Sequence, residues 1–106
     1  MKLIMAIVNK DDAPRVADAV MEAGFFATKL ATTGGFLKAG NTTFLIGTEE
    51  EKVDEVIALV GKHSKRRTQL VSGTAYGAMH AAAFPVEVTV GGATIFVMDV
   101  ERFEKL

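Results

Sequence analysis

The sequence contains no cysteine and only two histidines, and its charges nearly balance. Without cysteine the chain has no disulfide, thiolate zinc site or cysteine nucleophile. Its 12 basic and 13 acidic residues give a formal net charge of -1, whereas a duplex nucleic-acid binder normally has a basic excess. No apolar run approaches the roughly 20 residues that span a bilayer. We therefore expect no nucleic-acid polymer as partner and no membrane insertion.

The apolar start of the chain also lacks the features of a secretory signal. Residues 1–8 continue directly into Asn9, Lys10, Asp11 and Asp12, with no small-residue cleavage site. We interpret this start as a first strand, and cytoplasmic localisation follows as the default expectation.

Apolar residues and glycine, in contrast, are abundant. The 106 residues suit a single domain over 1–106, and 49% of them are hydrophobic before the 10 glycines are counted. An average globular chain reaches about 45–50% only when glycine is included. A domain of this size has little interior in which to bury the excess. We therefore expect part of the apolar surface to contact another subunit.

The hydrophobic pattern predicts two helices. Asp11 or Asp12 can cap the first helix, Pro14 suits its first turn, and Gly24 is a candidate left-handed residue at its end. The second helix is expected to begin at a capping box formed by Thr48 and Glu51. It then places Val53, Val56, Ile57 and Val60 on one face and is expected to end at Gly61.

The remaining segments predict strands. The expected ranges are 3–8, 25–33, 41–47, a short strand near 69–71, 86–90 and 94–100, with Gly91 and Gly92 forming a hairpin turn or a bulge. The order is β-α-β-β-α-β with an added C-terminal hairpin, which is the ferredoxin-like α+β pattern. Both helices should cover one face of an antiparallel sheet, and oligomerisation is the simplest way to cover the other face.

Several segments are candidate sites, each with an ordinary structural alternative. Glycines in residues 34–40 can hold a phosphate or form a plain connection, and Phe36 and Leu37 at this loop need an apolar partner. The basic run 62–67 is more typical of a solvated helix end than of a phosphate site. His63 and His80 have no acidic neighbours at metal-ligand spacing. The low-polarity loop 76–84 can close over a ligand or pack on a subunit.

No arrangement of residues predicts an enzyme. The sequence has neither a Ser-His-Asp arrangement nor a paired-carboxylate site. We therefore expect no catalytic residues, no metal and no cofactor.

A longer stretch of sequence resembles a known family. The string ATKLATTGGFL at 27–37, together with residues 1–4, 38–44, 85–88, 91–94 and 96–97, closely resembles the P-II-like cyclic di-AMP receptor family. The resemblance extends over nearly the whole chain. It implies a homotrimer of P-II architecture with one nucleotide site in each cleft between subunits. It also implies signalling without catalysis, in which loops rearrange on cyclic di-AMP binding and act on an unknown downstream protein.

The resemblance also implies which residues contact the ligand. These are Gly24, Phe26, Ala27, Thr28, Gly35, Phe36, Leu37, Asn41, Gly47, Gly91, Gly92, Phe96 and Lys105. Backbone N–H groups at the glycines suit phosphate oxygens, and the Phe36-Leu37 pair suits adenine.

This chain departs from the family pattern at some of these positions. Family members usually have Asn and Arg where this chain has Gly24 and Phe26, so a charge-assisted donor to the anionic ligand is missing. Near the C-terminus, family members usually have Gln at the position where this chain has Lys105. The loop 72–84 is shorter and lacks the Pro-Met-Gly-Gly and Asp-Ser-Tyr stretches.

Other functions compete with this interpretation. One is a P-II-type regulator that binds ATP or ADP and acts on a transporter or enzyme, although 34–40 is short for its projecting loop. Another is a structural oligomer. A third is a ferredoxin-like enzyme such as an acylphosphatase, which needs an arginine after the first strand, where this chain has residues 9–12 without one.

Overall fold

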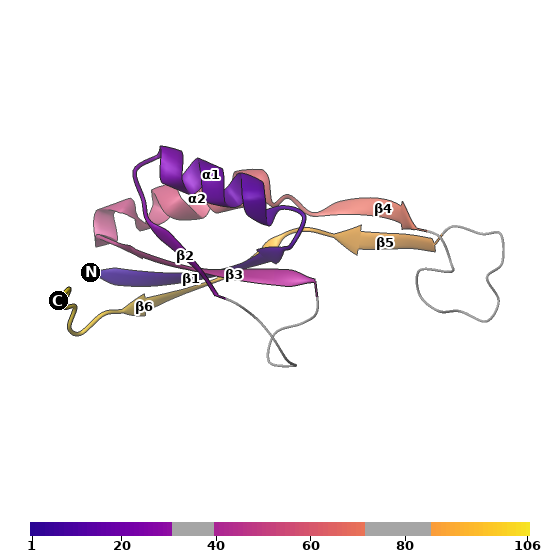
Figure 1. Ribbon diagram of the computed structural model, residues 1–106. Coiled ribbons are helices and arrows are strands. Elements are labelled where there is room, and N and C mark those ends of the chain that lie inside the picture. Colours follow the sequence, from indigo (N-terminus) through magenta and orange to yellow (C-terminus); the bar gives the residue numbers. More distant parts are fainter. Residues whose placement is uncertain (31–39, 72–85) are drawn as a thin grey trace.

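The chain forms a two-layer structure in which two helices lie on one face of a four-stranded sheet (Figure 1). The computed structural model describes residues 1–30, 40–71 and 86–106. The elements are, in chain order, β1 (Lys2–Asn9), α1 (Ala13–Glu22), β2 (Ala27–Leu30), β3 (Asn41–Thr48), a 3₁₀ turn η1 (Glu50–Lys52), α2 (Val53–His63), β4 (Arg67–Val71), β5 (Val86–Val90) and β6 (Ala93–Asp99).

The main sheet is antiparallel and has the strand order β2-β3-β1-β6. β1 is central: Met5 pairs with Leu45 of β3 on one side and with Phe96 of β6 on the other. β4 and β5 form a separate antiparallel pair that projects from the layered body (Figure 1). The body and the projecting pair are joined at the start of β4 and at the end of β5.

The helix-covered face of the main sheet forms the core. Alternate residues of a strand point to opposite faces, so one set from β1 and the paired set from β3 meet the helices. The helices contribute apolar residues at i, i+4 spacing. The buried residues of this core are Ile4, Ala6, Val8, Ala13, Val16, Val20, Phe44, Ile46, Val56 and Val60.

The other face of the main sheet is also apolar, but the two helices do not cover it. Leu3, Met5 and Ile7 of β1 alternate with the core residues and are half-buried. On β6, Phe96 and Met98 are on the same face, and 52% and 38% of their surfaces are exposed. We call this surface the open face.

The ends of α1 match the predicted proline and glycine, but the predicted aspartate cap does not form. Pro14 lies in the first turn, and Gly24, just beyond the helix, has a φ of +93°. Asp12 occupies the N-cap position, but its side chain makes no capping hydrogen bond. The carboxylate binds two arginines instead, as described below.

Two predictions for α2 are wrong. Neither η1 nor α2 has a side-chain cap, so the Thr48–Glu51 capping box does not form. Thr48 remains in β3, where it pairs with Lys2 and is buried, and the chain makes the 3₁₀ turn before α2 begins. The helix also passes through Gly61 and ends at His63, with Ser64 as C-cap. The Ser64 hydroxyl donates to the Val60 carbonyl (2.5 Å), which accounts for a helix end without a left-handed glycine.

The strands match the predicted segments, but their pairing differs at the C-terminus. Gly91 and Gly92 do not form a hairpin turn between their flanking strands, because β5 pairs with β4 and β6 pairs with β1. β6 therefore occupies the edge of the sheet beside β1. The ferredoxin-like α+β fold is confirmed, but the added C-terminal hairpin is replaced by the β4–β5 pair, which was not predicted. Residues 31–33 of the predicted strand 25–33 lie outside the described residues.

Candidate functional site

A cavity of about 530 Å³ lies where β1 ends, β3 begins and β5 passes into β6. Its polar lining includes Asn9, Lys10, Asn41 and Arg66 together with Thr89 and Thr94. Lys10 is held at this end of the sheet because its backbone N–H donates to the Gly40 carbonyl (2.8 Å). The cavity thus combines amide, hydroxyl and cationic side chains from four separate segments.

Gly91 and Gly92 form part of the cavity wall and have a backbone that other residues rarely adopt. Their φ angles are +87° and +80°. A Cβ atom on Gly91 would lie 2.5 Å from the Lys65 carbonyl oxygen and 2.7 Å from Nη1 of Arg67. The Gly92 N–H donates to the Ser64 carbonyl. Glycine is therefore needed here for the chain to pass close to the start of β4.

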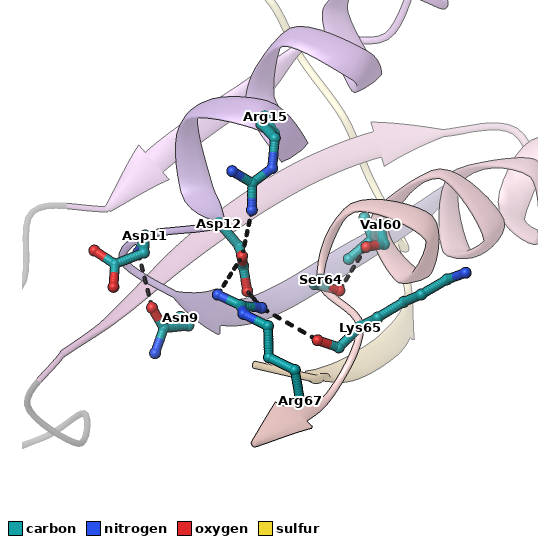
Figure 2. A network of polar contacts seen from close by, with 8 residues as sticks. All are labelled: Asn9, Asp11, Asp12, Arg15, Val60, Ser64, Lys65 and Arg67. Atoms are coloured by element: carbon teal, nitrogen blue, oxygen red, sulfur yellow. Dashed lines mark hydrogen bonds and ion pairs between the residues drawn. The ribbon is translucent and has the colours of Figure 1, made fainter. Parts of the chain in front are cut away.

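A buried carboxylate connects α1 to the same segment. Asp12 has no exposed surface, and its Oδ1 is 2.7 Å from Nη2 of Arg15 and 3.0 Å from Nη2 of Arg67 (Figure 2). Nη1 of Arg67 also donates to Oδ2 of Asp12 and to the Lys65 carbonyl, both at 3.2 Å. Charge-assisted bonds of this kind offset the cost of burying a carboxylate. We call Asp12, Arg15 and Arg67 the Asp12 cluster; it fixes the base of the projecting strand pair.

The only pKa shifts resolved for the described residues are far from the cavity, at the other end of β1. The Lys2 ammonium group donates to the Asp99 carboxylate, which raises the pKa of Lys2 and lowers the pKa of Asp99. Both are surface groups that pair across β1 and β6. They stabilise the two ionised forms and show no sign of proton-transfer chemistry.

The structure separates the predicted ligand residues into two groups. Asn41, Gly91 and Gly92 line the cavity. A second group lies around β2 and the end of β3, where Thr28 pairs with Leu45, close to Gly47. Its members are Gly24, Phe26, Ala27, Thr28 and Gly47. Along β3, Gly47 is about 20 Å from Asn41, whereas Leu45, the partner of Thr28, is only about 13 Å from it.

The other predicted ligand residues belong to neither group. Phe96 lies in the middle of β6 on the open face, opposite Met5. Lys105 is exposed in the C-terminal segment after β6. Gly35, Phe36 and Leu37 lie outside the described residues, as does the loop 72–84.

Lys10, Arg66 and the Asp12 cluster were not predicted as functional residues. Lys10 belongs to a segment without arginine, and Arg66 belongs to the basic run 62–67, for which a solvated helix end was favoured over a phosphate site. They are 56 positions apart in the sequence, and both line the cavity. No local motif signals this proximity, because it depends on how α2, β5 and β6 are placed. His63 lies in the last turn of α2, and the described residues contain no group of three potential metal ligands.

The layered body and the projecting strand pair define a small α+β protein of the ferredoxin-like, P-II-like class. None of its described helices is long and apolar enough to cross a membrane. The sequence model of the cyclic-di-AMP receptor family matches residues 1–106, and the chain belongs to this family. The resemblance inferred from the sequence is thereby confirmed.

A solved structure supports the same fold. The chain is similar to a protein from Pediococcus pentosaceus ATCC 25745, described as functionally unknown, with 43% sequence identity and a TM-score of 0.75. The match covers 99% of this chain and 96% of that chain.

Proposed function

We propose that this protein is a non-enzymatic receptor that binds cyclic di-AMP in the clefts between the subunits of a homotrimer. The family match over the whole chain is the observation that supports the ligand. In this proposal binding rearranges the loops around the site, and the new loop arrangement acts on a downstream protein. The receptor works in the cytoplasm without a cofactor.

The separation of the ligand residues favours a site between subunits. One group lies at the cavity where β3 begins, and the other extends from the middle of β3, where Thr28 pairs with Leu45, to Gly47 near its far end. In an oligomer, the group around β2 of a neighbouring copy can lie next to the cavity group of this protomer. Binding then requires assembly, because neither group alone completes the site.

The open face favours assembly of the same chain. It presents Met5, Leu45, Phe96 and Met98 in the middle of the sheet, and large contiguous apolar surfaces of this kind usually mark interfaces. A closed symmetric assembly buries the same face on every copy.

The absence of catalysis in this proposal is consistent with the chemistry of the described residues. The buried carboxylate of Asp12 is already bound by two arginines, so it is not available as a general base. The shifted pKa values belong to Lys2 and Asp99, which form an ion pair with each other at the surface. Neither arrangement activates a nucleophile or a water molecule.

Calorimetric titration with cyclic di-AMP, ATP, AMP and cyclic di-GMP tests the proposed ligand. We expect saturable binding of cyclic di-AMP at one ligand per subunit and much weaker binding of the others. No heat with cyclic di-AMP at high micromolar protein would disprove the ligand assignment. Preferential binding of ATP would favour the P-II-type regulator instead.

Sedimentation of wild type and Met5→Glu tests the site between subunits. A carboxylate in the middle of the open face should dissociate the trimer, because an unpaired charge is costly to bury. The monomeric variant should lose cyclic di-AMP binding while keeping its helical circular dichroism. Full affinity in a monomer would show that the site lies within one protomer.

Phe26→Arg tests the missing family arginine. Phe26 is 87% exposed, so the substitution adds a guanidinium group without disturbing the core. We expect tighter binding of cyclic di-AMP, by about tenfold, since a charge-assisted bond to a phosphate is worth about 1.5–3 kcal/mol. Phe103→Arg adds the same charge at another exposed aromatic and is the matched control. Equal affinities for both variants would contradict the role assigned to position 26.

A further inference from the structure

Two cations in the cavity lack an acidic partner. Lys10 and Arg66 both line the cavity, and within residues 1–30, 40–71 and 86–106 neither forms an ion pair or a side-chain hydrogen bond. Their neighbour Arg67 differs, because it forms an ion pair with Asp12. No Asp or Glu is among the described residues that line the cavity. The cavity therefore has a local excess of positive charge in a chain whose overall charge is nearly balanced.

Arg66 lies beside one glycine of the cavity wall. The Arg66 side chain passes close to Gly92, where a Cβ atom would lie 3.7 Å from its Nε. The Gly92 N–H already donates to the Ser64 carbonyl. The Gly92 N–H is therefore not available to an anion at this place, whereas the Arg66 side chain is.

The rest of the lining indicates which part of a nucleotide fits. The apolar lining residues that the structure describes are aliphatic, such as Ile7 and Val90, and none is aromatic. Nucleobases are usually held by stacking on aromatic rings, whereas phosphates are held by lysine, arginine and polar donors. Asn41 and Thr94 add such donors beside the two cations. The lining therefore suits a phosphate better than a base.

We propose that Lys10 and Arg66 bind a phosphodiester group of the ligand in this cavity. This inference rests on the proposed function, because it assigns the phosphate-binding residues of the same receptor site. The two phosphodiesters of cyclic di-AMP are anionic at neutral pH. The two residues neutralise one of them and come from separate segments, Lys10 from the end of β1 and Arg66 from just before β4.

Calorimetric titration of charge-removing variants is the first test. Lys10→Gln and Arg66→Gln should each weaken cyclic di-AMP binding by about tenfold, and the double variant should weaken it further. The affinity of the double variant should also depend less on salt, because fewer charges are screened. Arg66→Lys keeps the charge and should retain most of the affinity. Lys62→Gln removes one exposed charge on α2 outside the cavity and should change affinity by no more than about twofold.

Inorganic pyrophosphate provides a test that does not depend on the nucleotide. We expect it to shift the amide NMR signals of Gly91 and Gly92 in wild type and in Lys62→Gln, but not in the double variant. Cyclic di-AMP binding that is equally tight in wild type and the double variant would overturn the inference and leave the receptor function intact. If wild type binds pyrophosphate through Lys10 and Arg66 but fails to bind cyclic di-AMP, the phosphate site is supported and the receptor function is disproved. Binding of neither probe to wild type would disprove both proposals.

Discussion

The two faces of the main sheet are built from neighbouring residues of the same strands, yet their environments differ completely. In β3, Ile46 faces the helices and has no exposed surface, whereas the adjacent Leu45 lies on the open face. In β1, Ile4 and Met5 show the same contrast. Both faces are apolar, so apolar character alone does not distinguish an intramolecular core from an interface.

The polar groups at the edges differ between the two faces. At one end of the covered face Lys2 pairs with Asp99, and near the other end the Asp12 cluster joins α1 to β4. The other ion pairs among the described residues are Met1–Glu49 at the strand ends, Lys52–Glu55 and Arg102–Glu104, and none of them joins a helix to the open face. The helix-covered face is therefore fully packed within one protomer, whereas the open face is suited to contact with a partner subunit. Substitutions that act on one face only test this contrast.

The largest expected effect comes from truncating adjacent residues of β3. Ile46→Ala leaves a cavity in the core and should lower the free energy of unfolding by about 2–5 kcal/mol. Leu45→Ala removes a side chain of the same size from the open face and should lower it by less than about 1.5 kcal/mol in dilute monomer. Urea denaturation at several protein concentrations separates the two effects. Equal losses at low concentration would mean that both faces belong to the folding core.

The elements could be predicted from the sequence because each depends on local chemistry. The apolar run of β1, the proline and glycine at the ends of α1 and the valine stripe of α2 are all local signals. Two predictions failed because they depend on contacts between distant parts of the chain. The Thr48–Glu51 capping box did not form because Thr48 is held in β3 by its pairing with Lys2. The hairpin at Gly91 did not form because β6 pairs with β1. Both errors arise from long-range strand pairing, which no local signal records.

A smaller effect is expected where the Asp12 cluster closes the covered face. Arg67 contacts both oxygens of the buried Asp12 carboxylate, whereas Arg15 contacts one and is 60% exposed. Arg67→Gln should cost about 1.5–3 kcal/mol of stability, because it leaves a buried carboxylate with less of its compensation. Arg15→Gln should cost about 1 kcal/mol or less. Chemical denaturation of the two variants measures the difference, and a larger loss for Arg15→Gln would contradict the geometry.

The candidate site could be predicted only in part, and for the same reason. Motif resemblance identified Asn41, Gly91 and Gly92, which do line one cavity. It did not indicate that Gly47 lies near the other end of β3, or that Thr28 pairs with Leu45 in the middle of the strand. It also missed Lys10 and Arg66, because a cation pair 56 positions apart becomes visible only once the strands are placed.

The smallest expected effect is a pH dependence at the other closed end of the covered face. Bonding to Lys2 lowers the pKa of Asp99, and the same bond raises the pKa of Lys2. A carboxyl with a lowered pKa stabilises the fold above its ordinary pKa of about 4, and this contribution disappears as the pH falls through the lower value. The raised pKa of Lys2 stabilises the fold at all pH values below its ordinary pKa of about 10.4. This contribution is lost only as the pH rises above that value.

Asp99→Asn should therefore lower the melting temperature slightly at pH 7, and the difference from wild type should shrink towards pH 2. High salt should shrink it too, because both groups are at the surface. Asp18→Asn, at an exposed acid of α1 for which no ion pair is found among the described residues, controls for the general loss of a negative charge. A difference that grows as the pH falls would show that the carboxylate does not stabilise this end of the sheet. The covered face would then depend on apolar packing and on the Asp12 cluster alone.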